Sequence, residues 1–136
     1  MQDVTLLYKA KPNTKKGTHF GSRIVFDNDG YLYFTVGDRG KRDENPQDLS
    51  RDGGKVYRLM ENGDIPTDNP FVFVKDAKTA VFSYGHRNPQ GMTKHPVTGE
   101  IWTHEHGPRG GDEINIVQAG KNLSLIHISE PTRQIR

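Results

Sequence analysis

The sequence predicts an all-β chain built from repeated antiparallel units, of the kind that form the blades of a β-propeller. Its 136 residues include 15 glycines and 8 prolines, a composition that favours turns and short strands. No 11-residue window has an apolar face at positions i, i+3, i+4 and i+7, so no helix is predicted. Two similar strand–turn–strand units lie about 70 residues apart, which indicates successive blades. Two repeats alone leave a β-sandwich open as the alternative.

The first unit is a hairpin followed by further strands. Residues 22–27 and 31–36 are apolar runs separated by Asn28-Asp29-Gly30. Asparagine or aspartate followed by glycine between such runs is a strong hairpin signal. Two later runs are also predicted to be strands: 55–59 and 80–84. Residues 22–84 are therefore predicted to form most of one blade.

The second unit has the same design. Residues 90–96 lead into Val97-Thr98-Gly99, a weaker turn signal, and residues 100–104 follow as a strand. This unit, extended to Val117, is predicted to begin the next blade.

Composition excludes several classes of partner and site. The net charge is +2, from 19 basic and 17 acidic residues that are interspersed along the chain. Interspersed charges are typical of a solvated surface rather than a nucleic-acid interface. No window approaches the roughly 18 apolar residues of a membrane span. Cysteine is absent, so neither a disulfide nor a thiolate metal site can form. The hydrophobic fraction of 32% is small for a self-contained core.

Two segments carry candidate site residues next to predicted strands. His19 lies just before the first strand, where loops gather at one mouth of a propeller, and histidine suits general-base work near neutral pH. Arg87 and Asn88 lie in a loop bounded by Gly85 and Gly91, and a guanidinium can bind a carboxylate or quinone oxygen. A surface or packing histidine and a plain polar turn are the alternatives.

A third segment, 104–115, is rich in potential metal ligands. His104 and His106 would share one face of a strand, a spacing compatible with zinc. The glycines and carboxylates that follow suit calcium, which takes carboxylate and backbone oxygens. Spacing alone selects neither metal, and a solvated turn is the alternative.

Four stretches follow one another in a specific order: HFGSRIVFDNDGYLYFTVGDRG, GDIPTDNPF, GHRNPQGM and HEHGPRGGDEINI. Together they resemble the soluble glucose and aldose sugar dehydrogenases that depend on pyrroloquinoline quinone (PQQ). The similarity extends from Leu6 to Asn122, and the last stretch is closer to the broader aldose sugar dehydrogenase branch.

The resemblance implies a six-bladed β-propeller with PQQ over the mouth of its channel, and this chain would supply a fragment of about two to three blades. His19 matches the general base that takes the proton of the sugar's anomeric hydroxyl, while hydride passes from the same carbon to PQQ. Thr18 stands where some relatives have an acid, so no carboxylate is available there to orient His19.

The resemblance also assigns cofactor and metal contacts. Arg87 and Asn88 match residues that contact PQQ. The backbone carbonyls of Gly107 and Pro108 match ligands of the catalytic calcium, and Glu113 matches a ligand of a second, structural calcium. The implied enzyme is periplasmic or secreted and converts an aldose to its lactone, with an electron acceptor that the sequence does not name.

Two other functions stay open. A non-catalytic extracellular propeller of the same superfamily would be a binding module. A zinc hydrolase that uses His104 and His106 lacks an evident third ligand.

The end of the chain differs in kind. From Leu123 the text Leu-Ser-Leu-Ile-His-Ile-Ser-Glu-Pro-Thr-Arg resembles the translation of a transposase adapter used for sequencing libraries. It begins where the resemblance expects Asn-Tyr-Gly-Trp-Pro, of which only Asn122 is present. We therefore expect residues 1–122 to be an internal propeller fragment, inactive alone, and residues 123–136 to be a non-native tail.

Overall fold

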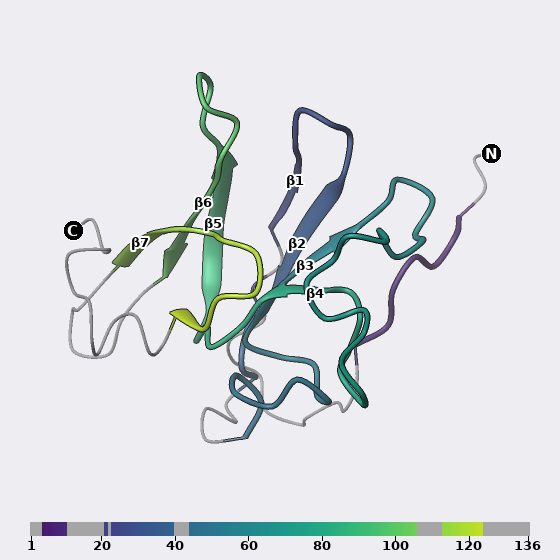
Figure 1. Cartoon of the computed structure of the whole chain (residues 1–136). Coiled ribbons are helices and arrows are strands. Elements are labelled where there is room, and N and C mark those ends of the chain that lie inside the picture. The colour runs from purple at the N-terminus through teal and green to yellow at the C-terminus, as the bar shows by residue number, and fades with distance from the viewer. Residues whose placement is uncertain (1–3, 11–20, 22, 40–43, 106–112, 124–136) are drawn as a thin grey trace.

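The chain forms two antiparallel sheets that lie against one another (Figure 1). The computed structural model describes residues 4–10, 21, 23–39, 44–105 and 113–123. The first sheet has the strand order β1-β2-β3-β4, with bounds Ile24–Phe26, Leu32–Val36, Lys55–Leu59 and Val81–Ser83. The second has the order β5-β6-β7, with bounds Pro89–Lys94, Ile101–Glu105 and Glu113–Ile116. The all-β prediction is confirmed, whereas the number of blades stays a prediction.

The β1–β2 hairpin forms where the sequence predicts it. Phe26 pairs with Leu32 across the turn. The Asp27 carboxylate fixes the turn, because its Oδ1 accepts the N–H groups of Asp29 and Tyr31, each at 2.9 Å. Aspartate favours turns for this reason. A local side chain therefore sets the register of the first two strands.

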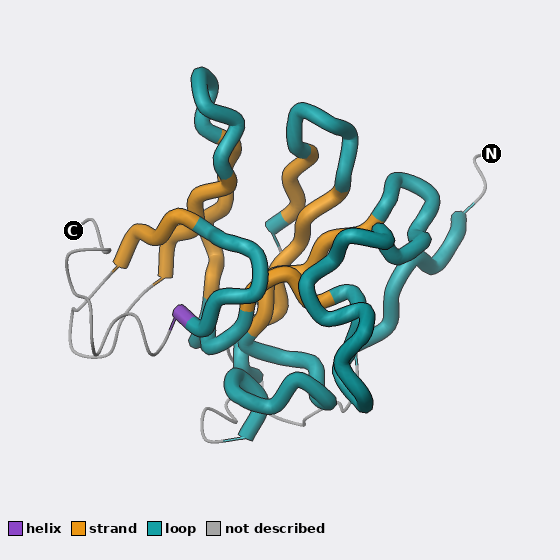
Figure 2. Tube along the Cα trace, in the orientation of Figure 1, coloured by secondary structure: helices purple, strands orange, loops and turns teal. Residues whose placement is uncertain are grey.

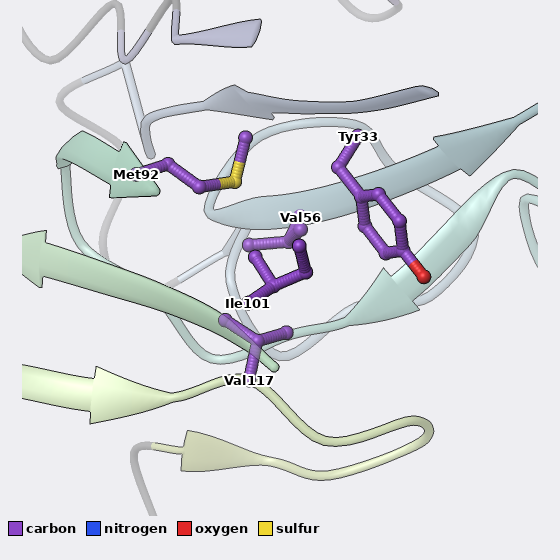
Figure 3. Packing of buried hydrophobic residues seen from close by; sticks show 5 residues of the cluster. All are labelled: Tyr33, Val56, Met92, Ile101 and Val117. Atoms are coloured by element: carbon purple, nitrogen blue, oxygen red, sulfur yellow. The ribbon is translucent and has the colours of Figure 1, made fainter. Parts of the chain in front are cut away.

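One hydrophobic core lies between the two sheets (Figure 3). Tyr33 and Val56 come from the first sheet, while Met92 and Ile101 come from the second, and Val117 follows directly after β7. Each fully buried side chain of this kind contributes about 1.5–3 kcal/mol. This shared core fixes the position of one sheet relative to the other.

A second cluster covers the opposite face of the first sheet. Tyr57 and Leu59 alternate with Val56 along β3 and so point to the other side. Phe34 stacks on Tyr57 with ring centroids 4.8 Å apart, and Tyr8 of the N-terminal segment packs on both rings. The central strands β2 and β3 of the first sheet therefore have packed side chains on both faces.

The strand ends that flank the candidate residues lie at one end of the sheets. Antiparallel pairing places the end of β2 beside the start of β3, and pairs Val56 near the start of β3 with Ser83 at the end of β4. In the second sheet, Pro89 at the start of β5 pairs with Glu105 at the end of β6. Figure 2 shows these strand ends passing into loops. The candidate site therefore lies at this end of the sheets.

The predicted absence of a membrane span and the predicted boundary at Leu123 can be compared with the structure. Within the described ranges, no helix is long and apolar enough to cross a membrane. Leu123, the first residue of the expected tail, is buried, and its N–H donates to the Tyr84 carbonyl at 3.0 Å. The division between residues 122 and 123 stays a prediction.

Candidate functional site

A buried carboxylate gathers three consecutive residues of the loop between β4 and β5. Glu105 is only 4% exposed at the end of β6. Its Oε1 accepts the backbone N–H groups of Arg87 at 2.7 Å and Asn88 at 3.1 Å. Its Oε2 lies 2.9 Å from Nδ1 of His86. Glu105 therefore holds the segment that contains both predicted PQQ contacts.

The surroundings of Glu105 keep its carboxyl group ionised. Burial alone would raise the pKa, but the hydrogen bond and charge of His86, with the N–H groups of Arg87 and Asn88, lower the pKa below its ordinary value. An ionised carboxylate only accepts hydrogen bonds, so Nδ1 of His86 is the donor. On the other side of the same ring, Nε2 lies 2.7 Å from Oγ of Ser83.

The same loop is joined to the segments around β1 and β2. The Asp38 N–H donates to the Arg87 carbonyl at 2.7 Å, and the Gly21 N–H donates to Oδ1 of Asn88 at 3.0 Å. Gly21 has φ +71°, and a Cβ there would come within 2.9 Å of the Gly37 nitrogen. Only glycine allows this close approach.

Lys55 organises the loop that precedes β3. Its side chain is fully buried, and Nζ donates to the carbonyl oxygens of Asn45 and, at 2.8 Å, Gly53. Burial lowers the pKa of Lys55 to about 8, although the charges of Asp52 and Asp48 act in the opposite direction. A buried lysine with two backbone partners holds this loop closed.

Gly54 packs that loop against the candidate site. The His86 N–H donates to the Gly54 carbonyl at 2.9 Å, and the Gly85 N–H donates to the Pro46 carbonyl at 2.8 Å. A Cβ at Gly54 would lie 2.5 Å from the His86 carbonyl oxygen, and φ is +68°. The 44–54 loop and the 85–88 segment therefore form one packed unit.

The structure describes only part of the predicted site. Arg87 and Asn88 lie side by side at the sheet end, the first half-buried and the second 6% exposed. His19, Gly107 and Pro108 lie outside the described residues. The Glu113 backbone begins β7 and pairs with Glu105, while its side chain is outside the described part.

The metal predictions stay open. Within the described ranges, no group of three or more His, Asp or Glu side chains could hold a metal ion. His104 lies on β6, but its predicted zinc partner His106 is outside those ranges, as are Gly107 and Pro108.

The donor chemistry of the described site fits PQQ. PQQ carries several carboxylates and quinone oxygens, and Arg87 presents a guanidinium suited to such acceptors. Asn88 adds a side-chain amide. Glu105 already fixes the backbone of both residues through hydrogen bonds. Their backbone position in the fold therefore does not depend on the cofactor.

Sequence reasoning missed Glu105, His86 and Lys55 as site residues. Alternation along β6 buries Ile101, Thr103 and Glu105 on one face. Glu105 lies in the buried phase of a strand and is the first residue of the EHGP stretch, and this is the signal that could have found it. Lys55 stands in a predicted strand, and no residue near it in the sequence indicates that it is buried.

Comparison with known proteins gives the family. The family model for Glucose / Sorbosone dehydrogenase matches residues 1–128. The chain is 48% identical over 120 residues to aldose sugar dehydrogenase YliI of Escherichia coli (strain K12), covering 88% of this chain and 32% of that protein. It spans about a third of the length of the curated relatives it matches first.

Solved structures agree with this match. A structure described as glucose dehydrogenase has a TM-score of 0.84 at 44% identity, covering 87% of this chain and 34% of that one. The PQQ-bound form of aldose sugar dehydrogenase from Streptomyces coelicolor has a TM-score of 0.70 at 34% identity, covering 79% and 30%. The chain therefore belongs to the glucose/sorbosone dehydrogenase family.

Proposed function

We propose that this chain is part of a PQQ-dependent aldose sugar dehydrogenase, which oxidises the anomeric carbon of an aldose to the lactone. The observation that carries the proposal is the convergence of two motif segments at one sheet end. Arg87 and Asn88 share the Glu105 carboxylate, and Asn88 is bonded to Gly21, two residues after His19. The names of the relatives, one of them a PQQ-bound enzyme, support the same reaction.

Arg87 and Asn88 are the residues of this chain that would hold PQQ. Bound PQQ supplies a quinone that accepts the hydride of the sugar. The Arg87 guanidinium would hold a carboxylate or quinone oxygen and stabilise the negative charge that develops there. Because the backbone is fixed in advance, this charge needs little rearrangement during the reaction.

His19 is the proposed general base. A neutral imidazole would accept the proton of the anomeric hydroxyl as hydride leaves the same carbon. The hydrogen bond between Gly21 and Asn88 ties the segment that carries His19 to the cofactor-binding residues. Thr18 offers no carboxylate to this histidine, so its orientation has to come from elsewhere.

The proposed enzyme also binds a catalytic and a structural calcium ion. Gly107 and Pro108 would supply carbonyl oxygens to a catalytic ion, and Glu113 would supply a carboxylate to a structural one, which are the ligands calcium prefers. The segment that contains Gly107 and Pro108 begins directly after Glu105 and joins β6 to β7. We also propose a six-bladed propeller, a periplasmic or secreted location and a non-native origin for residues 123–136.

The test uses the full-length protein that contains this chain, prepared without cofactor. PQQ and calcium together should restore oxidation of aldoses with an artificial electron acceptor. His19→Ala should lower kcat by about 10²–10⁴-fold and change PQQ affinity little. Near-normal kcat in this variant would refute the assignment of the base. A wild-type protein that binds PQQ but oxidises no aldose would point to the binding module instead.

A further inference from the structure

We infer that Glu105 is a positioning residue of the cofactor site, which fixes the backbone of Arg87 and Asn88 and thereby the direction of their side chains. The inference rests on the proposed role of these two residues in holding PQQ. It assigns a function to a buried side chain that takes no part in the reaction itself.

The backbone N–H groups of Arg87 and Asn88 have a side chain, not a strand, as their partner. The β5–β6 ladder begins only at Pro89, which pairs with Glu105, and its register shifts between Pro89 and Gly91. The two residues before Pro89 therefore lie outside the ladder. Their N–H groups donate instead to one carboxylate oxygen, at 2.7 and 3.1 Å. A side chain thus replaces the missing strand partner, and two consecutive peptide planes are oriented toward one atom.

The Glu105 carboxylate is itself held in place. His86 is 1% exposed and lies 2.9 Å from the second oxygen of Glu105 through Nδ1. Its Nε2 lies 2.7 Å from Oγ of Ser83, the last residue of β4. Both oxygens of Glu105 are therefore engaged, and the group cannot rotate without breaking contacts on either side. The chain of contacts runs from β4 through His86 to the loop.

Residues 87 and 88 also contact segments on the other side of the loop. Asn88 accepts the Gly21 N–H through Oδ1, and the Arg87 carbonyl accepts the Asp38 N–H. A shift of residues 87 and 88 would disturb both bonds. Misplacement of a binding group by about 1 Å can cost on the order of 10²-fold in rate. Glu105 therefore influences turnover as well as cofactor affinity.

Two conservative variants separate the position of the acceptor from its charge. Glu105→Asp keeps the charge but withdraws it by one methylene, out of reach of the two N–H groups. Glu105→Gln removes the charge but keeps an oxygen in place to accept them, and its amide can donate to the other tautomer of His86. Ile101→Ala is the control, because Ile101 is buried on the same face of β6 but belongs to the intersheet core.

The measurements use the full-length protein. Amide hydrogen exchange of Arg87 and Asn88 is followed without cofactor, and PQQ affinity is measured by titration of the same preparation. Glu105→Asp should speed exchange at both amides by about 10-fold or more. PQQ affinity should fall by about 10- to 100-fold, the usual scale when an orienting partner is lost. Glu105→Gln should stay near wild type in both measurements.

The outcomes separate the inference from the proposed function. Unchanged exchange and affinity in Glu105→Asp would overturn the inference. So would the same two losses in Ile101→Ala, because they would then reflect general destabilisation. A wild-type protein that binds no PQQ would refute the proposed function. Faster amide exchange in Glu105→Asp would in that case still show that Glu105 fixes the backbone of residues 87 and 88.

Discussion

At the scale of single residues, the backbone and the side chain of Arg87 have different roles. Its N–H and carbonyl groups bond to Glu105 and Asp38, so the main chain is held without help from the guanidinium. The guanidinium is the group proposed to hold a carboxylate or quinone oxygen of the cofactor. Substitution of the side chain should leave the local backbone in place.

Arg87→Ala should consequently weaken PQQ binding and turnover together. Loss of a fixed charge that stabilises developing negative charge costs about 10²–10³-fold in kcat. PQQ titration and steady-state kinetics of the full-length protein measure both quantities. Lys75→Ala is a matched control, because Lys75 is an exposed cation in another loop. Normal PQQ affinity in Arg87→Ala would contradict the assignment.

Lys55 gives a prediction about pH and stability. Its pKa is about 8 in the folded protein and 10.5 ordinarily, so the unfolded chain binds more protons between these values. Stability from this group should therefore be greatest above 10.5 and lost as the pH falls through about 8. The free energy of unfolding of wild type relative to Lys55→Met should rise between pH 7 and about 9.5 in urea titrations. A flat difference would contradict burial of this lysine.

At the scale of elements, local signals predicted the strands better than the site. Residues 55–59 were predicted as a strand and form β3 with the same bounds, and the Asn28-Asp29-Gly30 turn forms as expected. β7 was missed as a separate strand, although Glu113–Ile116 alternates polar and apolar residues. The carboxylates of this stretch and the glycines before it were interpreted as metal ligands, and its strand period was overlooked.

The site shows the limit of local reasoning. Arg87 and Asn88 could be proposed as cofactor contacts because their motif is contiguous in the sequence, and this assignment stays a prediction. Glu105 acts on them from 17 or more residues away, through the pairing of β5 with β6. Lys55 is buried only because the 44–54 loop folds over it. Alternation along β6 indicates that Glu105 is buried, but it does not identify the residues that Glu105 contacts through tertiary packing.

Gly54 offers a test of how the 44–54 loop packs on the site. Gly54 and Gly30 both have positive φ, +68° and +86°, so alanine strains the backbone at either position. A Cβ at Gly54 also meets the His86 carbonyl at 2.5 Å, whereas a Cβ at Gly30 meets nothing within 4 Å. Gly30→Ala should cost about 1 kcal/mol of stability and Gly54→Ala about 2 kcal/mol more. Equal losses in denaturant titrations would show that the packing is looser than described.

At the scale of the whole molecule, the two sheets leave apolar surface at both sides. On β1, Ile24 is 63% and Phe26 51% exposed. On the second sheet, an apolar groove is lined by residues that include Trp102 and Ile114. Exposed strand edges and apolar faces of this kind favour association between chains. The relatives, which are about three times as long, contain further chain that could cover such surfaces.

The isolated 136-residue chain should therefore neither unfold cooperatively as a monomer nor oxidise aldoses. Among the residues that the structure describes, the intersheet core has five buried side chains, a small number against the conformational entropy of the whole chain. Thermal unfolding by circular dichroism, with sedimentation to report association, measures this with PQQ and calcium present. The full-length protein under identical conditions is the control and should give one sharp transition and sugar-dependent reduction of the acceptor. A sharp two-state transition in a monomer of the isolated chain would show that the two sheets form an independent folding unit. In that case the surfaces on β1 and β6 would need no further chain to cover them.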